Sequence, residues 1–147
     1  MDASGAGGGV RDLVRMSLED VETRLRKVLP AFTDVAGAYL FGSCLGACRP
    51  DSDIDLGLVL RGNIDAVYLE ARVAAALGLV EGHPFHITVL TAGEFAFQTI
   101  HAGRLIYEAD AEAVADMIEK VAKDHHANRR YLATFVAARA ESLRQWL

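Results

Sequence analysis

Apolar residues recur three or four positions apart between residues 18 and 29, a spacing that predicts an amphipathic helix. The apolar stripe consists of Leu18, Val21, Leu25, Val28 and Leu29. Ser17 precedes the stripe and predicts an N-cap, with Asp20 as the acid of a capping box. Pro30 follows the stripe, and we expect the helix to end there.

Further along, short apolar runs alternate with stretches of helical character. Strands are expected at residues 35–41, 53–60 and 84–90, with a short edge strand at 105–107. One helix is expected at residues 64–77. Another is expected to begin at Thr91, as an N-cap with Glu94 as its partner, and to run to Gly103.

No glycine or proline interrupts the chain after residue 110, which predicts helix up to the C-terminus. Two apolar stripes occur there, one made of Val114, Met117, Ile118 and Val121, the other of Leu132, Phe135, Val136, Leu143 and Trp146. The polar residues 124–128 between the stripes predict a break between two helices. The order of helices and strands is typical of an α/β (α+β) fold with a C-terminal helical segment.

The composition is that of one globular domain, with 147 residues, 52% of them apolar, and three prolines. Residues 1–10 are rich in glycine and alanine and predict a disordered leader, so one domain is expected over residues 11–147, with helices over 111–147. The net charge of −5 argues against a protein that coats nucleic acid. It leaves room for a small anionic substrate whose charge a metal offsets.

Cys44 and Cys48 are four positions apart, without the further ligands that a zinc site needs nearby. We expect them to be small, half-buried residues of a reduced protein. No secretory signal segment and no apolar run long enough to span a bilayer is recognisable, so a cytoplasmic location is expected.

Asp53 and Asp55 stand two positions apart at the start of the second expected strand. Side chains at positions i and i+2 of a strand project from the same face, so the two carboxylates are expected side by side. Paired carboxylates suit Mg²⁺, which takes substrate phosphate oxygens as further ligands. The alternative is a pair of solvated acids at the mouth of a strand.

Gly42 and Ser43 follow the first expected strand and offer a place for phosphate. Glycine lets the backbone approach a phosphate, and the next helical turn offers free N–H groups, to which the Ser43 hydroxyl adds a donor. Arg49 is either a contact of the triphosphate or a solvated loop arginine. The run is not a Walker A loop, because the G-K-[ST] ending is absent. Together with Asp53 and Asp55, the turn predicts a nucleotide and metal site.

These residues resemble a known signature. Residues 42–60, GSCLGACRPDSDIDLGLVL, resemble the G-S followed by D-x-D of the DNA polymerase β-like nucleotidyltransferase superfamily, and the short chain resembles its minimal members. Residues 103–110, GRLIYEAD, resemble the G-x-x-L-Y-E-x-D passage that follows in that family. The resemblance implies a small mixed sheet flanked by helices, which binds ATP or another nucleoside triphosphate with Mg²⁺ and transfers a nucleoside monophosphate to a hydroxyl.

In several bacteria the minimal enzyme is the antitoxin of a HEPN-domain RNase toxin and adenylylates a tyrosine of that toxin. The resemblance therefore implies a HEPN-domain protein as partner. The leading hypothesis is transfer of AMP from ATP to a hydroxyl of that partner. A second is a catalytically impaired protein that neutralises its partner by binding alone. A third is a nucleotidyltransferase for a small molecule or RNA, for which residues 111–147 are a short acceptor domain, so that a homodimer would have to share the site.

One position departs from the family pattern. The family carries a third carboxylate in a later strand, as P-V-D-L-V-x-L, and residues 84–90 here read PFHITVL, with His86 in place of the acid. Neutral imidazole is a poor ligand for Mg²⁺ but an acceptable one for Mn²⁺ or Zn²⁺, and it can act as a general base. Transfer is therefore lost, or His86 serves as the base, or another metal is used. The remaining alternative is a histidine without a role.

Other histidines carry weaker signals. His83 and His101 are expected at the surface rather than as ligands. His125 and His126, with Arg129 and Arg130 close by, form a polar and basic cluster. We expect a solvated helix face there in preference to a contact with phosphate or RNA.

Overall fold

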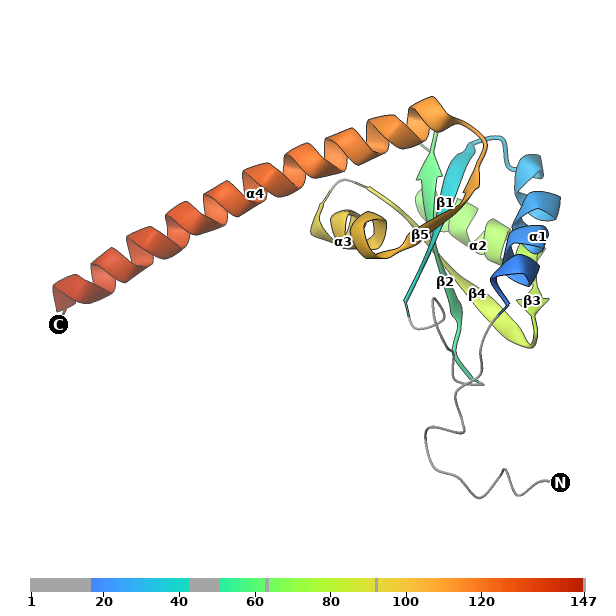
Figure 1. Ribbon diagram of the computed structural model, residues 1–147, viewed down its shortest axis with the longest axis horizontal. Helices are drawn as coiled ribbons and strands as arrows, with labels where there is room; N and C mark the ends of the chain where they lie inside the picture. Colours follow the sequence, from blue (N-terminus) through green and yellow to red (C-terminus); the bar gives the residue numbers. More distant parts are fainter. Residues whose placement is uncertain (1–16, 43–50, 63, 92, 147) are drawn as a thin grey trace, which may run out of the picture.

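The computed structural model describes residues 17–42, 51–62, 64–91 and 93–146 of the 147-residue chain (Figure 1). Ser43, Cys44, Cys48 and Arg49 lie outside the described residues. The elements in chain order are α1 (Leu18–Val28), the 3-10 turn η3 (Leu29–Ala31), β1 (Val35–Phe41), β2 (Ile54–Leu60), α2 (Ala66–Leu77), β3 (Leu79–Val80), β4 (His83–Val89), α3 (Glu94–Ala102), β5 (Arg104–Glu108) and α4 (Ala111–Trp146).

The first helix forms as its sequence predicts. The Ser17 hydroxyl accepts a hydrogen bond from the backbone N–H of Asp20, at 3.2 Å, and satisfies one of the free donors of the first turn. The α-helix ends at Val28, and Pro30 lies in the single 3-10 turn that follows. The predicted cap and the predicted end of the helix are both confirmed.

Five strands form one mixed sheet in the order β3-β4-β2-β1-β5. β1 runs antiparallel to β2 and to β5, whereas β2 and β4 are parallel neighbours. β3 is a two-residue strand, antiparallel to β4, that the sequence pattern did not predict. The mixed sheet expected from the family resemblance is confirmed.

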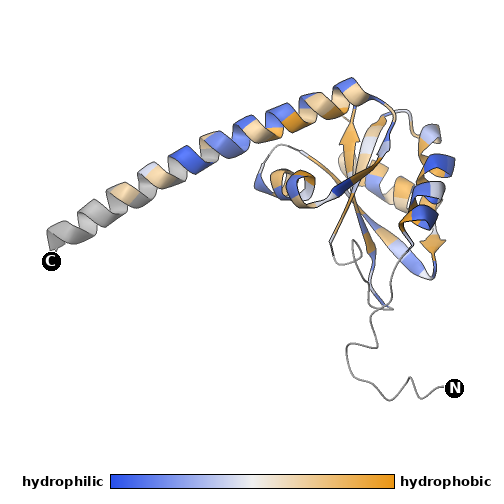
Figure 2. Cartoon of the chain, in the orientation of Figure 1, coloured by the Kyte–Doolittle hydropathy of each residue, from blue (hydrophilic) through white to orange (hydrophobic). Residues whose placement is uncertain are grey.

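Each face of the sheet carries its own hydrophobic layer, because successive side chains of a strand point to opposite faces. On one face Ile54, Leu56 and Leu58 of β2 pack in a cluster with Leu25 of α1 and Val73 of α2. The cluster on the other face contains Tyr39, Val59 and Leu90 from the sheet side, Ala96 of α3, and Val114 and Val121 of α4. Figure 2 shows apolar colours gathered on the strands between the helices.

Several predicted boundaries differ from the structure, and those of β4 and β5 differ by one residue at each end. α2 begins at Ala66 with Asp65 as its N-cap, and β2 begins at Ile54, one residue after Asp53. α3 begins at Glu94, so the cap predicted at Thr91 is wrong. Gly93 is the N-cap instead, at φ 137°, a backbone conformation that residues with side chains rarely adopt.

The predicted break near residues 124–128 is also wrong, because α4 is one helix of 36 residues from Ala111 to Trp146. Polar side chains do not remove a backbone hydrogen bond, and residues 124–128 contain neither glycine nor proline, the two residues that destabilise the interior of a helix most. Its first half packs beside α3, and the rest extends away from the sheet (Figure 1). None of the helices in the described ranges combines the length and the apolar character needed to cross a membrane.

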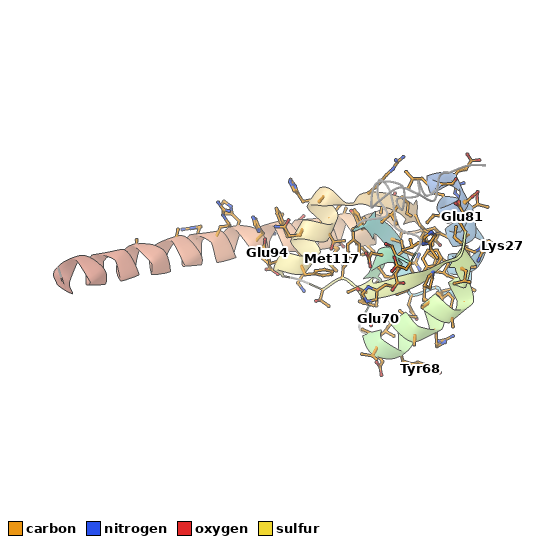
Figure 3. All side chains as sticks on the ribbon, turned by 90° about the horizontal axis from the view of Figure 1, so that it is seen from below. Lys27, Tyr68, Glu70, Glu81, Glu94 and Met117 are labelled. Atoms are coloured by element: carbon orange, nitrogen blue, oxygen red, sulfur yellow. The ribbon has the colours of Figure 1, made fainter. Side chains whose placement is uncertain are left out.

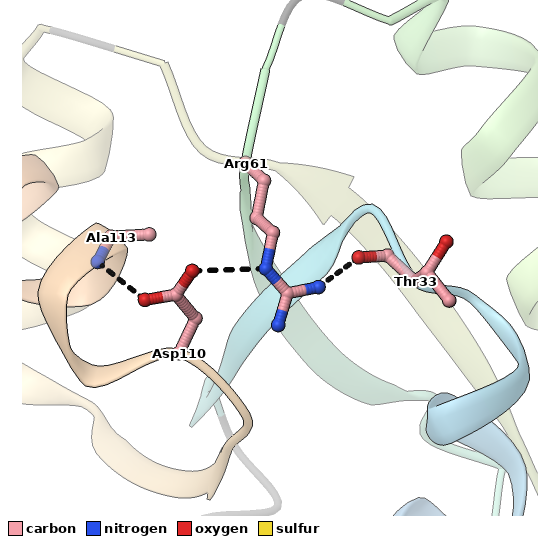
Figure 4. A network of polar contacts seen from close by, with 4 residues as sticks. All are labelled: Thr33, Arg61, Asp110 and Ala113. Carbon is pink, nitrogen blue, oxygen red and sulfur yellow. Dashed lines mark hydrogen bonds and ion pairs between the residues drawn. The ribbon is translucent and has the colours of Figure 1, made fainter.

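A polar network fastens the start of α4 to the sheet (Figure 4). One oxygen of Asp110 accepts from the Ala113 N–H at 3.0 Å, and the other accepts from Arg61 Nε at 3.0 Å. Arg61 also donates to the carbonyl oxygen of Thr33. The hydrogen bond from Ala113, followed by that from Arg61, lowers the pKa of the Asp110 carboxyl. Asp110 therefore caps α4 and joins it to the loops at the ends of β2 and η3.

We predict that Asp110→Ala lowers the thermal midpoint of unfolding at pH 7. The folded-state pKa of Asp110 is lowered, so its contribution is present above the unfolded value of about 3.9 and is lost as the pH falls through the folded value. Melting curves at pH 7 and at about pH 3 test this. The difference from the parent should shrink at acid pH, and exposed Asp116→Ala on the same helix serves as the control. An equal difference at both pH values would contradict the prediction.

Candidate functional site

Three strands bring the predicted site residues to one end of the sheet. β1 ends at Phe41 and β2 begins at Ile54 at this end, and Phe41 is the register partner of Asp55. Asp55 is in turn the parallel register partner of His86 in β4. Because Ile54 and Leu56 point into the core cluster beneath α1 and α2, Asp55 projects from the opposite face.

Asp55 and His86 contact each other directly. Asp55 Oδ1 lies 3.1 Å from His86 Nδ1, and the side chains are 26% and 63% exposed, respectively. When Nδ1 carries the proton, it donates to the carboxylate, and Nε2 is left as an acceptor. The pair is thus a carboxylate-oriented imidazole at the open end of the sheet.

Gly42 lies against the Asp55 carboxylate. Its φ is +80°, and a Cβ built on it would meet Asp55 Oδ2 at 2.3 Å and Cγ at 3.1 Å. A side chain at this position would therefore be strained and would also displace the carboxylate. The approach of a phosphate to this turn stays a prediction, and Ser43 and Arg49, the other residues predicted to contact the nucleotide, lie outside the described residues.

His83 is buried, which the sequence did not predict. It is only 4% exposed, and its Nδ1 lies 2.8 Å from the carbonyl oxygen of Ser52. The expectation of a surface residue is therefore wrong, because the alternation along β4 sends His83, Phe85 and Ile87 to the buried face. His83 fixes the segment that leads into Asp53. The alternation itself was the signal that could have identified it.

Phe95 is a second neighbour of this end that no motif indicated. Its ring meets that of Phe41 edge to face, with centroids 5.7 Å apart. Phe95 is 54% exposed, so α3 presents an aromatic surface next to the end of β1. In the sequence it is indistinguishable from an ordinary apolar helix position.

Two acids of the site, Asp53 and Asp55, could hold one cation if the substrate supplied its other ligands. Within the described residues, no group of three or more His, Cys, Asp or Glu is arranged to hold a metal ion. Asp53 and Asp55 remain as two carboxylates, the number with which Mg²⁺ is commonly held when substrate phosphates complete its coordination. His86, the residue that the sequence resemblance aligns with the third acid of the family, has its Nδ1 3.1 Å from Asp55 Oδ1.

A family model described as Polymerase beta, Nucleotidyltransferase matches residues 23–112. The chain belongs to the polymerase beta nucleotidyltransferase family. The matched range includes β1, β2 and β4, and with them Gly42, Asp55 and His86. The family resemblance seen in the sequence is thus confirmed. No curated protein sequence matches the chain.

Solved structures show the same fold in this nucleotidyltransferase family. One is the tri-AMPylated Shewanella oneidensis HEPN toxin in complex with MNT antitoxin, with a TM-score of 0.54 and 16% identity over 83% of this chain and 98% of that chain. A second is a toxin–antitoxin with AMP-PNP, with a TM-score of 0.53 and 16% sequence identity over 84% of this chain and 98% of that chain. A third is the toxin–antitoxin MntA–HepT, with a TM-score of 0.51 and 15% sequence identity over 80% of this chain and 95% of that chain. At such low sequence identity, the similarity to these structures shows a shared fold and nothing more.

We predict that Gly42→Ala destabilises the protein more than Gly82→Ala does. Both glycines have positive φ, at +80° and +84°, which costs a residue with a side chain about 1–2 kcal/mol. Only Gly42 has a neighbour, Asp55, in the place of the added methyl group, whereas Gly82 has nothing within 4 Å. Chemical denaturation of both variants measures the difference. Equal losses of stability would mean that Gly42 does not lie against Asp55.

Proposed function

We propose that this protein is an antitoxin that transfers AMP from ATP to a hydroxyl group of a HEPN-domain partner protein in the cytoplasm. The observation that carries the proposal is the meeting of Gly42, Asp55 and His86 at one end of a nucleotidyltransferase-family sheet. Further support comes from fold neighbours that are described as a tri-AMPylated HEPN toxin with MNT antitoxin and a toxin–antitoxin with AMP-PNP.

In the proposed site, the Gly42 turn and the Ser43 hydroxyl hold the β- and γ-phosphates, and Arg49 adds positive charge near the triphosphate. Asp53 and Asp55 would hold one Mg²⁺, or Mn²⁺, together with phosphate oxygens. Bound there, the cation would neutralise charge on the triphosphate, which is the main task in phosphoryl transfer chemistry. Gly42 contributes by leaving room for the phosphate and for the Asp55 carboxylate at once.

His86 is the proposed general base. Asp55 accepts from Nδ1 and so keeps Nε2 free to take the proton of the acceptor hydroxyl. The hydroxyl oxygen then forms a bond to the α-phosphorus of ATP, while the bond from that phosphorus to the bridging oxygen breaks. AMP is joined to the acceptor, pyrophosphate leaves, and the proton stays on His86 until solvent removes it.

A second candidate function is neutralisation of the partner by binding alone. It is favoured by the replacement of the third acid by His86 and by the finding that the described residues contain no three-ligand metal group. In this case the nucleotide would bind without reacting, and the protein would act by covering its partner.

We predict that Asp53→Asn combined with Asp55→Asn weakens Mg²⁺-dependent ATP binding by about 10-fold or more, because both carboxylates of the proposed cation site are lost. Isothermal titration calorimetry with ATP, with and without Mg²⁺, measures this. Asp51→Asn, an exposed acid of the same loop, should leave the affinity unchanged. Unaltered Mg²⁺-dependent binding in the double variant would remove the site assignment.

We predict that His86→Ala slows transfer of AMP to a co-expressed HEPN-domain protein by about 10²–10⁴-fold, the range typical of a lost general base. ATP affinity should stay close to that of the parent, because His86 is not assigned to the phosphates. The measurement is transfer of α-labelled ATP with Mg²⁺ or Mn²⁺, and His126→Ala, an exposed histidine of α4, is the control.

His86→Asp separates the two candidate functions. Loss of an existing activity in that variant identifies His86 as a working base. Transfer that appears only in the His86→Asp variant identifies the natural protein as a binding-only antitoxin and contradicts the enzymatic proposal.

A further inference from the structure

The charges of the chain are divided unequally at the middle of α4. Residues 125–147 carry four arginines and one glutamate, a net charge of +3. Residues 1–124 carry eleven basic and nineteen acidic residues, a net charge of −8. The chain therefore consists of an acidic body and a basic helical arm, which we define as residues 125–146 of α4.

The first residue of the arm contacts the body. His125 stacks on Phe97 of α3 with ring centroids 3.5 Å apart, and its Nδ1 lies 2.9 Å from Glu94 Oε1. Beyond this point α4 runs straight out from the body (Figure 1). At 1.5 Å per residue the arm is about 33 Å long. Its sequence repeats apolar residues at helical spacing, so it is amphipathic.

The body offers a complementary groove between α3 and the first half of α4. A cavity of about 330 Å³ is lined by Phe97, Ile100, His101, Ile118, Val121 and Ala122. Ile118 is 40% exposed although it is a large apolar residue. Figure 3 shows Glu94 and Met117 at this junction of α3 and α4.

Acidic residues lie on both helices that form this groove. Glu94 lies on α3, and exposed Glu112 and Glu119 lie on the first half of α4, where Glu119 also accepts a hydrogen bond from Lys123 Nζ at 2.9 Å. Hydrogen bonds from Gln98 and His125 lower the pKa of Glu94, and Arg129 of the arm lowers it further. Glu94 thus already lies within the electrostatic reach of one arginine of its own chain.

We propose that two copies of this protein pair through α4, with the arm of each copy in the α3/α4 groove of the other. An antiparallel arrangement with two-fold symmetry makes both contacts at once and places each basic arm along an acidic body. An amphipathic helix seated in an apolar groove is a common mode of recognition. A second copy is the occupant because this one chain carries both the groove and the helix that matches it in charge.

The symmetry axis of such a pair lies near the middle of the contact, close to residue 128. Glu112 and Glu119 of one copy then lie about level with the end of the partner's arm, where the sequence has Arg139 and Arg144. Charge reversal on either side should therefore abolish the pair, and reversal on both sides should restore it.

Sedimentation velocity of the full chain, purified alone, tests the proposal. The protein is expected to be a dimer that dissociates when NaCl is raised to about 1 M, because salt screens the exposed charges. The arm variant Arg139→Glu/Arg144→Glu and the groove variant Glu112→Lys/Glu119→Lys should each be monomeric. Their equimolar mixture should form a heterodimer, in which each arm faces a groove of opposite charge.

Two controls separate this contact from general effects of charge and hydrophobicity. Arg26→Glu/Lys27→Glu on α1 changes the net charge by the same amount as the arm variant and should leave the dimer intact. Ile118→Glu should break the dimer, whereas Val67→Glu, at a residue 76% exposed on α2, should not.

Three kinds of result would overturn the proposal. The first is an oligomeric state that does not fit it, either a monomer at every concentration or a dimer that persists in both charge-reversed variants. The second is a monomer whose arm binds RNA, with binding lost in the arm variant. The third is a monomer whose arm variant loses only the complex with a co-expressed HEPN-domain protein, since that protein would then occupy the groove or hold the arm.

Discussion

The parallel pairing of β2 with β4 is the constraint on which the site depends. Ile54, Leu56 and Leu58 must point into the core beneath α1 and α2, so Asp55 is directed to the opposite face. The register then sets Asp55 beside His86, and the antiparallel pairing with β1 sets it beside the Gly42 turn. The hydrophobic layer on one face of the sheet thus positions the polar groups on the other.

Much of the secondary structure could be predicted from the sequence, because it depends on residues that are close together along the chain. The apolar run predicted β2 to within one residue, the capping residue Ser17 predicted the start of α1, and the signature residues predicted the family. Chain order alone left open which strands are neighbours. The contact of Asp55 with His86 follows from pairing strands 31 residues apart, and only the family resemblance indicated it.

Other features escaped the sequence because tertiary context decided them. His83 looked like a surface histidine, but the inward face of β4 buries it against the Ser52 carbonyl. Thr91 looked like a helix cap, but the chain turns at Gly93 instead. Residues 124–128 looked like a break, yet their polarity does not interrupt a helix whose backbone hydrogen bonds remain intact.

We propose a separate function for each end of the fold. The end of the sheet with Gly42, Asp55 and His86 is the proposed site of chemistry, where an oriented imidazole stands in for a family carboxylate. The far end carries α4, whose basic arm extends from an acidic body. Assembly through the arm does not require the chemistry, so each can fail without the other.

The central claim is that this site transfers AMP in spite of the histidine. The most direct measurement is mass spectrometry of a HEPN-domain partner after incubation with the protein, ATP and Mg²⁺ or Mn²⁺. We predict an AMP adduct on a side-chain oxygen of the partner, absent when Asp55→Asn replaces the parent. A partner that stays unmodified with both metals, although the protein binds ATP, would contradict the claim.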